Sequence, residues 1–250
     1  MPSLHFLGTG SAVTDPHRTT TMLALHDPGS VIVVDCGGDV VQRVQACGLE
    51  PEEIAGVIVT HEHPDHVAGF PLMIQKLWLA GRKAPLPVYG ILPAITQASK
   101  CLEAFDTAGW EGLMEIQWME VPHEAGVKVL ETEQWLVTAT PAMHGVPNMA
   151  LRFTEKASGA ACVYGSDTAP SGEIADFARG ATILVHEATG DLPGHSTAPG
   201  AARVAQAAGV EVLYLVHLPH ESELGAPQLA EAREMFPQTF KAGELEQIRF

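Results

Sequence analysis

Six consecutive residues, HEHPDH at positions 61–66, constrain this chain more than any other stretch, because they directly follow the apolar run GVIVT at 56–60. Imidazole and carboxylate are ligand types that Zn²⁺, Mn²⁺ and Fe²⁺ accept. A strand that ends in a tight turn aims alternate side chains at one point, so we expect His61 and His63 to share one ion. Asp65 and His66 open the following helical segment and are expected to serve a second ion. The alternative interpretation is a solvated, histidine-rich turn.

Three distant residues have the chemistry that a two-metal site still lacks. His144, Asp167 and His217 each lie at or just beyond the end of an apolar, strand-like run. Taken singly, a histidine at a strand end is more often a hydrogen-bonded surface or core residue than a ligand. Together with the first motif, the three favour a site in which a carboxylate bridges two cations about 3.5–4 Å apart.

These residues give the chain a resemblance to metallo-β-lactamase-fold hydrolases. The resemblance rests on motifs in the order typical of that family, namely FLGTGSA at 6–12, VVDCGG at 33–38, HEHPDH at 61–66, and then His144, Asp167 and His217. It implies an α/β fold, the four-layer αβ/βα sandwich of the metallo-β-lactamase type, and it covers nearly the whole chain.

Within that superfamily the chain most resembles the tRNase Z branch, whose marks are HEAT at 186–189 and GHSTA at 194–198. The resemblance implies that His61, His63 and His144 hold one metal, that Asp65, His66 and His217 hold the other, and that Asp167 bridges them. It also implies that Asp65 orients the attacking water, while His195, braced by Glu187, protonates the leaving oxygen. The implied cofactors are two divalent ions, for which zinc is expected and manganese or iron is compatible.

Elementary chemistry supports this division of roles. Two divalent ions make hydroxide accessible near neutral pH and neutralise charge on a phosphoryl or acyl oxygen. A departing alkoxide still needs a proton, and a histidine suits this step because its ordinary pKa of about 6.5 lies near neutrality. The alternative for His195 is a helix-entry residue in a loop where Ser196 or Thr197 caps a helix over 198–208.

Composition predicts one soluble domain, residues 1–250. A chain of 250 residues with 46% hydrophobic content can bury one good core, and strand-like and helix-like segments alternate throughout. No apolar run approaches the roughly 18 residues that cross a bilayer, so we expect no membrane association. The four cysteines form no CxxC pair. Free buried thiols and a cytoplasmic location are therefore expected.

Charge and spacing argue against a large polyanionic substrate. The formal net charge is −16, whereas nucleic-acid binding draws its affinity mostly from Lys and Arg. The tRNA-gripping arm typical of the branch is inserted between the single histidine and the bridging aspartate, but His144 and Asp167 are only 23 positions apart. Two strands, 149–154 and 160–165, joined by a short turn, fill that interval. tRNA binding is therefore not expected, and small or cyclic phosphodiesters or short RNA are favoured.

Three functions remain open at this stage. The leading hypothesis is a dinuclear metal-dependent phosphodiesterase of the ribonuclease Z-like class, and the others are a lactone or carboxylic-ester hydrolase using the same metals and a non-catalytic binding member of the fold. The substrate-binding residues are unknown. The segment from Phe105 to Trp118 combines large apolar groups with Gly and acidic residues, and we interpret it as a lid or a dimer contact. A homodimer is expected from the frequency of twofold oligomers.

Overall fold

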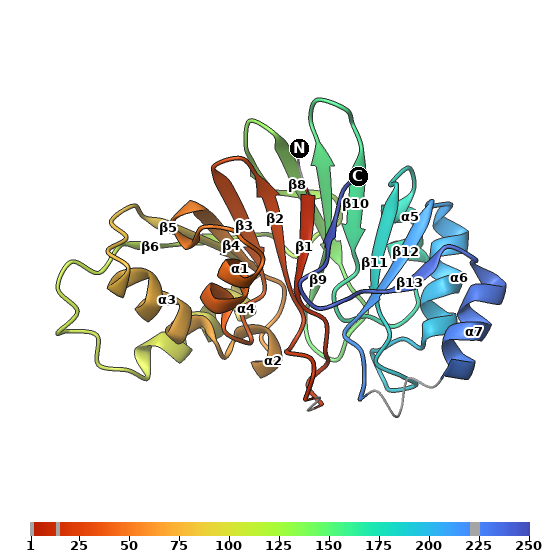
Figure 1. Ribbon diagram of the computed structural model, residues 1–250, viewed down its shortest axis with the longest axis horizontal. Helices are drawn as coiled ribbons and strands as arrows, with labels where there is room; N and C mark the ends of the chain where they lie inside the picture. The colour runs from red at the N-terminus through yellow and green to blue at the C-terminus, as the bar shows by residue number, and fades with distance from the viewer. Residues whose placement is uncertain (1–2, 14–15, 221–225) are drawn as a thin grey trace. The chain divides into compact units, whose positions relative to one another are not determined.

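The computed structural model describes residues 3–13, 16–220 and 226–250, and the chain forms two compact units (Figure 1). Unit 1 comprises Met1–Gly8, Thr20–Pro122 and Glu244–Arg249. Unit 2 comprises Thr9–Thr19, His123–Gly243 and Phe250. Within the described residues each unit contains one seven-stranded mixed sheet.

The sheet of unit 1 combines an antiparallel half with a parallel half. Its strand order is β14-β1-β2-β3-β4-β5-β6. Pairing is antiparallel from β14 to β3 and parallel from β3 to β6. The strands are β1 (Ser3–Gly8), β2 (Met22–Asp27), β3 (Ser30–Val34), β4 (Ile54–Val59), β5 (Leu86–Gly90), β6 (Ile116–Glu120) and β14 (Gln247–Ile248). The helices are α1 (Val40–Ala46), η1 (Pro51–Glu53), α2 (Pro64–Val67), α3 (Phe70–Leu79) and α4 (Leu92–Glu103).

Two glycines let the backbone of unit 1 fold tightly around the loop that follows β3. A Cβ atom at Gly37 would lie 1.7 Å from the carbonyl oxygen of Asp65, and one at Gly69 would lie 2.1 Å from that of Gly38. Any side chain at either position would collide with backbone, so both contacts require glycine. The start of α2, which contains Asp65 and His66, is thereby held directly against the end of β3.

Unit 2 repeats the same plan. Its strand order is β13-β12-β11-β10-β9-β8-β7, antiparallel from β7 to β10 and parallel from β10 to β13. The strands are β7 (Val127–Glu131), β8 (Trp135–Pro141), β9 (Met149–Glu155), β10 (Ala161–Tyr164), β11 (Ile183–Glu187), β12 (Val212–Val216) and β13 (Thr239–Lys241). The helices are α5 (Gly172–Ala178), α6 (Ala198–Ala208) and α7 (Ala226–Met235).

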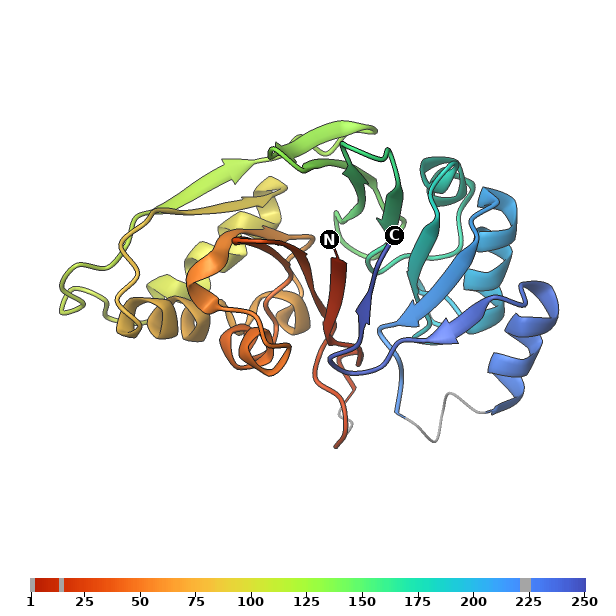
Figure 2. The same cartoon turned by 45° about the horizontal axis from the view of Figure 1, so that its top comes forward.

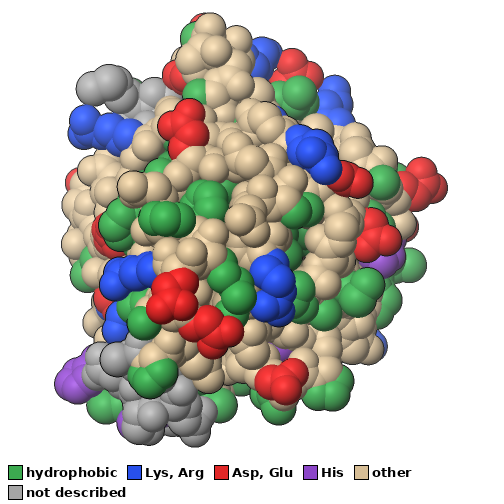
Figure 3. Space-filling model, turned by 90° about the vertical axis from the view of Figure 1, so that its right-hand side faces the viewer, with side chains coloured by type: hydrophobic (Ala, Val, Ile, Leu, Met, Phe, Trp, Pro, Cys, Tyr) green, Lys and Arg blue, Asp and Glu red, His purple; other side chains and the backbone are tan. Residues whose placement is uncertain are grey.

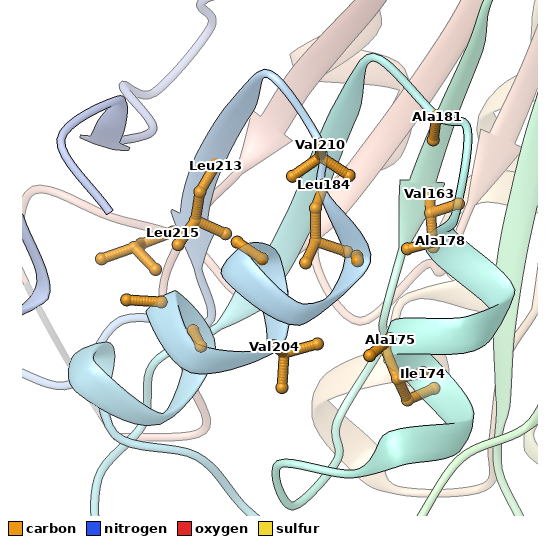
Figure 4. Packing of buried hydrophobic residues seen from close by; sticks show 14 of the residues in the cluster. Val163, Ile174, Ala175, Ala178, Ala181, Leu184, Val204, Val210, Leu213 and Leu215 are labelled. Carbon is orange, nitrogen blue, oxygen red and sulfur yellow. The ribbon is translucent and has the colours of Figure 1, made fainter. Parts of the chain in front are cut away.

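Small side chains allow α6 to pack closely on the sheet of unit 2. The helix begins where the Thr197 side chain accepts a hydrogen bond from the Gly200 amide, and it ends at Gly209, whose φ is +70°. Its face toward β11 and β12 is rich in alanine, and Val204 points toward α5 in the same buried cluster as Leu184 and Leu213 (Figure 4). In Figure 2, α6 and α7 lie side by side on one side of β12.

Most of the predicted elements are present. The helix expected over 198–208 has those bounds, and the strands expected at 149–154 and 160–165 are β9 and β10. The helical segment that was expected to begin at Asp65 and His66 consists of two helices, α2 and α3. Pro71 lies in the first turn of α3, where its missing amide hydrogen costs nothing. The prediction of one domain over 1–250 stays a prediction. None of the described helices is long and apolar enough to cross a membrane.

Candidate metal site

Four predicted ligands of unit 1 lie at the carboxyl end of β4 and in α2, and we call them the first half-site: His61, His63, Asp65 and His66. His61 and His66 are fully buried, whereas His63 and Asp65 are half-buried. His61 Nε2 and His63 Nδ1 lie 3.2 Å apart. Two nitrogens that bind one ion at about 2.0–2.1 Å would have a similar separation. His66 Nε2 lies 3.5 Å from Asp65 Oδ2, which suits two ligands of a second ion.

One buried carboxylate supports two of these imidazoles. Asp35, which follows β3, accepts hydrogen bonds from the Thr60 amide at 2.8 Å and from the Thr60 hydroxyl at 3.0 Å. Its Oδ2 atom also lies 2.9 Å from His66 Nδ1. Because a carboxylate only accepts, the proton of this bond is on His66 Nδ1, which leaves a lone pair on Nε2 for a metal.

The same reasoning fixes the tautomer of His61. Its Nδ1 atom lies 3.0 Å from the Thr60 hydroxyl, and that hydroxyl gives its single hydrogen to Asp35. The hydroxyl must therefore accept from His61 Nδ1–H, so Nε2 of His61 also carries a lone pair. Asp35 thus orients His66 directly and His61 through Thr60.

The predicted functional residues of unit 2 follow strands whose ends meet at one edge of the sheet. β9 is antiparallel to both β8 and β10, so β8 and β10 run in the same direction, as do β11 and β12. His144 follows β8, Asp167 follows β10, Glu187 ends β11 and His217 follows β12. We call His144, Asp167, His195 and His217 the second half-site. Ligand atoms of His144, Asp167 and His195 lie within 4.8 Å of one another, as do those of Glu187, His195 and His217.

Each imidazole of the second half-site that is predicted to bind metal has its own hydrogen-bond partner. His144 Nδ1 lies 2.9 Å from the carbonyl oxygen of Gly194, which can only accept, so the proton is on Nδ1 and Nε2 of His144 carries a lone pair. Gly194 has a φ of +78°, and a Cβ atom there would lie 3.2 Å from His144 Nδ1. His217 Nδ1 lies 2.6 Å from the Thr189 hydroxyl.

The backbone of Asp167 is fixed by a hydrogen bond from a buried side chain, and its carboxylate lies beside His217. Asn148 is fully buried, and its side-chain amide donates to the Asp167 carbonyl oxygen at 2.7 Å. The Asn148 side-chain oxygen accepts from the Ser166 hydroxyl at 3.1 Å. Asp167 Oδ2 lies 3.3 Å from His217 Nε2, a separation suited to two ligands of one ion.

His195 has a charged partner rather than a neutral one. Its Nδ1 atom lies 2.8 Å from Oε1 of Glu187, whose side chain is fully buried, and the His195 side chain is 17% exposed. Glu187 also accepts hydrogen bonds from the Thr168 and Thr189 amides. A buried carboxylate at this distance stabilises the imidazolium form, and Nε2 then has a proton to donate.

Backbone strain is concentrated beside these residues. Among the described non-glycine residues, positive φ occurs at Asp35, Ser166, His217 and Leu245. The first supports His66, the second precedes Asp167 and the third is itself a predicted ligand. Conformations that cost about 1–3 kcal/mol each commonly mark functional sites.

Sequence reasoning missed the residues that orient the ligands, namely Asp35, Thr60, Asn148, Thr189 and Gly194. Asp35, Thr189 and Gly194 were part of quoted motifs, but no role was assigned to them. Thr60 immediately precedes the HEHPDH motif, which was the available signal. Every residue predicted from sequence to bind metal or act in catalysis lies in one of the two half-sites or, as Glu187 does, contacts one.

The segment predicted to be a lid or a dimer contact is attached to α3 of unit 1. The Trp78 and Trp110 rings are stacked, with centroids 4.9 Å apart. Trp78 Nε1 donates to the Glu111 carbonyl oxygen at 2.9 Å, and Lys83 Nζ donates to that of Gly112 at 3.1 Å. These contacts give the segment a defined conformation, and both predicted roles stay predictions.

Surface charge is mixed on the side of the molecule that carries α6 and α7. Figure 3 shows that basic side chains there lie beside acidic ones and apolar groups, without a continuous basic stripe. The net charge of the whole chain is −16, so acidic groups outnumber basic ones. Neither feature provides the electrostatic attraction that long nucleic acids require.

Comparisons with known proteins place this geometry in a family. Residues 31–218 match the Beta-lactamase superfamily domain. Ribonuclease Z of Methanothermobacter thermautotrophicus is 30% identical, over 98% of this chain and 95% of the relative. Human tRNase Z, short form (ELAC1), has 22% identity and a TM-score of 0.81, covering 99% of this chain and 98% of that chain. A diphosphatase from the PhnP family has 19% identity and a TM-score of 0.77, covering 100% and 98%.

These matches confirm the predicted α/β fold class of the metallo-β-lactamase type. They also confirm the predicted activity class, a metal-dependent hydrolase of the ribonuclease Z-like phosphodiesterase type. The matched region contains every predicted ligand, and the His and Asp clusters of the two half-sites are suited to divalent metal ions. The chain belongs to the ribonuclease Z family of the metallo-β-lactamase superfamily.

Proposed function

We propose that the protein uses two divalent metal ions, zinc in the first instance, to hydrolyse small or cyclic phosphodiesters. The proposed ligands are His61, His63 and His144 for one ion and Asp65, His66 and His217 for the other, with Asp167 bridging. The tautomers of His61, His66 and His144 support the assignment, because Nδ1 donates in each and Nε2 carries a lone pair. Manganese and iron satisfy the same ligand chemistry.

The residues of the chain divide the reaction between them. When bound, two divalent ions lower the pKa of a water molecule and neutralise charge on the phosphoryl oxygens. Asp65 accepts a hydrogen bond from the attacking water and directs its lone pair at phosphorus. As the new P–O bond forms and the ester P–O bond breaks, His195 Nε2–H gives its proton to the leaving oxygen. Glu187 stabilises the imidazolium before transfer and keeps the ring oriented.

The His195–Glu187 pair is the observation that favours a phosphodiester over a lactone as the substrate. A carboxylic-ester or lactone hydrolase can stabilise its departing alkoxide on a metal alone, and it therefore has little need of an imidazolium held by a buried glutamate. In this chain the His195 Nδ1 to Glu187 Oε1 distance is 2.8 Å, and Glu187 is fully buried. Burying the Glu187 carboxylate costs free energy, and its bond to a protonated His195 offsets that cost. A non-catalytic role is disfavoured because neither half-site lacks a predicted ligand.

Substrate size is the second element of the proposal. Residues 144–167 form the short β9–β10 hairpin with its flanking loops, and they contain no extended arm. With a net charge of −16, the surface opposes long-range attraction of tRNA, whereas a small phosphodiester would respond mainly to the local cations. The name ribonuclease Z belongs to the relatives, and tRNA is the substrate we least expect here.

The test is a paired hydrolysis assay on metal-loaded protein with bis(p-nitrophenyl) phosphate, cyclic nucleotides, a precursor tRNA and a lactone panel. His195→Ala and Asp167→Ala are assayed beside His26→Ala, which replaces a histidine outside both half-sites. We expect phosphodiester cleavage that falls by about 10²-fold or more in His195→Ala. Lactone turnover that survives His195→Ala, without phosphodiester turnover, would instead establish the lactonase.

Location and assembly remain predictions. All four cysteines are free, with Cys36 and Cys162 buried and Cys47 and Cys101 half-buried. This supports the proposed cytoplasmic location, because reducing compartments keep thiols unpaired. We retain the homodimer as a proposal that sedimentation of the metal-loaded protein would test.

A further inference from the structure

The hydrogen bonds of Thr189 identify a role for the last residue of the HEAT motif. Its hydroxyl lies 2.6 Å from His217 Nδ1 and donates to the carbonyl oxygen of the same histidine at 3.1 Å. A hydroxyl has one hydrogen, and the carbonyl can only accept. The hydroxyl hydrogen therefore belongs to the carbonyl bond, and His217 Nδ1–H donates to the Thr189 oxygen.

We propose that Thr189 is a positioning residue whose hydroxyl fixes both the tautomer and the ring orientation of His217, so that Nε2 faces the metal. The inference rests on the proposed function, which makes His217 a ligand. Contact with the ring and the backbone carbonyl at once restricts rotation of the side chain relative to its own main chain. The His217 backbone is strained, with φ of +50°, so it needs such a constraint.

Thr189 is itself fixed by the residue that holds the proton donor. Its amide donates to Glu187 Oε2 at 3.1 Å, while Glu187 Oε1 binds His195 Nδ1 at 2.8 Å. The His195 and His217 rings are stacked, with centroids 5.8 Å apart and planes 9° from parallel. One glutamate therefore sets the position of the proton donor directly and that of a metal ligand through Thr189.

Two substitutions separate this role from a merely structural one. Thr189→Val keeps the shape and removes the hydroxyl, whereas Thr189→Ser keeps the hydroxyl. Thr138→Val is the matched control, because it makes the same change on β8 of unit 2 outside the site. Metal affinity is measured by competition with a chromophoric chelator, using Zn²⁺ and Co²⁺. The tautomer of His217 is measured by ¹H–¹⁵N NMR of histidine-labelled, metal-free protein, assigned with His217→Gln.

We expect Thr189→Val to bind one of the ions about 10–100-fold more weakly, the usual effect of losing such a partner, and Thr189→Ser to restore binding. The wild type and Thr189→Ser should have the Nδ1–H tautomer at His217, and Thr189→Val should lose this preference. Unchanged affinity and tautomer in Thr189→Val, even with a lower melting temperature, would overturn the inference.

The proposed function fails by a different result. If His217→Gln leaves metal affinity and phosphodiester hydrolysis unchanged, His217 is not a ligand. The NMR measurement needs no metal, so it tests the bond between Thr189 and His217 independently of that outcome. An Nε2–H tautomer in the wild type would refute the inference even if His217 proved to be a ligand.

Discussion

The two half-sites reach the same ligand chemistry by different routes. In unit 1 four predicted ligands lie within six consecutive residues, and one carboxylate, Asp35, orients two of the imidazoles. In unit 2 the ligands are spread from His144 to His217, and each histidine has a separate partner. Ligands that are close together in the sequence can be oriented by one common residue. Ligands that are far apart in the sequence each need their own hydrogen-bond partner, which the folding of a loop brings to them.

The second difference is the proton donor. Both half-sites contain an imidazole bonded to a buried carboxylate, but His66, paired with Asp35, is fully buried, whereas His195, paired with Glu187, is 17% exposed and is the residue to which we assign proton donation. On the proposed assignment, unit 1 is specialised for metal binding, while unit 2 combines metal binding with proton transfer. Substitutions in the two units should therefore affect different measurements.

Replacing the proton donor is expected to have the largest effect and to sharpen this contrast. His195→Ala should lower kcat for a phosphodiester with a poor leaving group by about 10²–10⁴-fold, because the leaving alkoxide receives no proton. Metal content, measured by mass spectrometry of the dialysed protein, should stay at the wild-type value. Loss of metal together with activity would show that His195 is a ligand and would remove the distinction between the units.

The second-largest effect is expected from replacing Asp35, the carboxylate that orients both His61 and His66. Asp35→Asn preserves the positive φ, which asparagine tolerates, but places an amide against His66 Nδ1–H or the Thr60 hydroxyl. Affinity for both ions should fall, each by about 10–100-fold, since both orienting bonds depend on one group. Chelator competition distinguishes the ions. Weakening of one ion alone would contradict the shared support inferred for unit 1.

Backbone contact gives a third contrast, which affects stability rather than activity or metal binding. Gly37→Ala places a Cβ 1.7 Å from the Asp65 carbonyl oxygen, whereas Gly194→Ala places one 3.0 Å from the Gly145 amide nitrogen in a residue with φ of +78°. We expect about 3 kcal/mol less unfolding free energy for the first and about 1–2 kcal/mol for the second. Urea unfolding of the metal-free proteins measures both. Equal losses would mean that the two turns are equally adaptable.

The smallest expected effect lies outside both half-sites. Burial, and to a lesser extent the nearby His26, lower the pKa of His5 in unit 1 to about 4. The unfolded chain, with a histidine pKa of about 6.5, then binds more protons between pH 4 and 6.5, so unfolding free energy falls as pH falls through that window. His5→Gln should flatten this dependence by about 2 kcal/mol or less. Identical pH profiles for variant and wild type would contradict the assignment.

The same contrast explains what the sequence predicted. HEHPDH is contiguous, so residue types alone indicated the first half-site. His144, Asp167 and His217 were found because each follows an apolar strand. The supporting residues were not found, because Asp35 reaches His66 only when β3 and β4 are neighbours, and Gly194 reaches His144 only when its loop folds back.

Prediction of the secondary structure also succeeded where the sequence pattern was strong and failed where it was weak. The two strands of the β9–β10 hairpin and the alanine-rich α6 have strong patterns, and their positions were predicted closely. Several short elements were not predicted, among them β6, a half-exposed edge strand, and α5, a helix of 7 residues. Both are short, and their stability comes from neighbours in the folded chain rather than from their own periodicity.

The central proposal, that the predicted ligands of the two half-sites hold two ions, is tested most directly by metal stoichiometry. Wild type, His63→Ala and His217→Ala are titrated with Zn²⁺, and bound metal per chain is measured. The account predicts two ions in the wild type and one retained ion in each variant, with a different affinity in the two. A single ion in the wild type, or two ions retained at wild-type affinity in either variant, would contradict it.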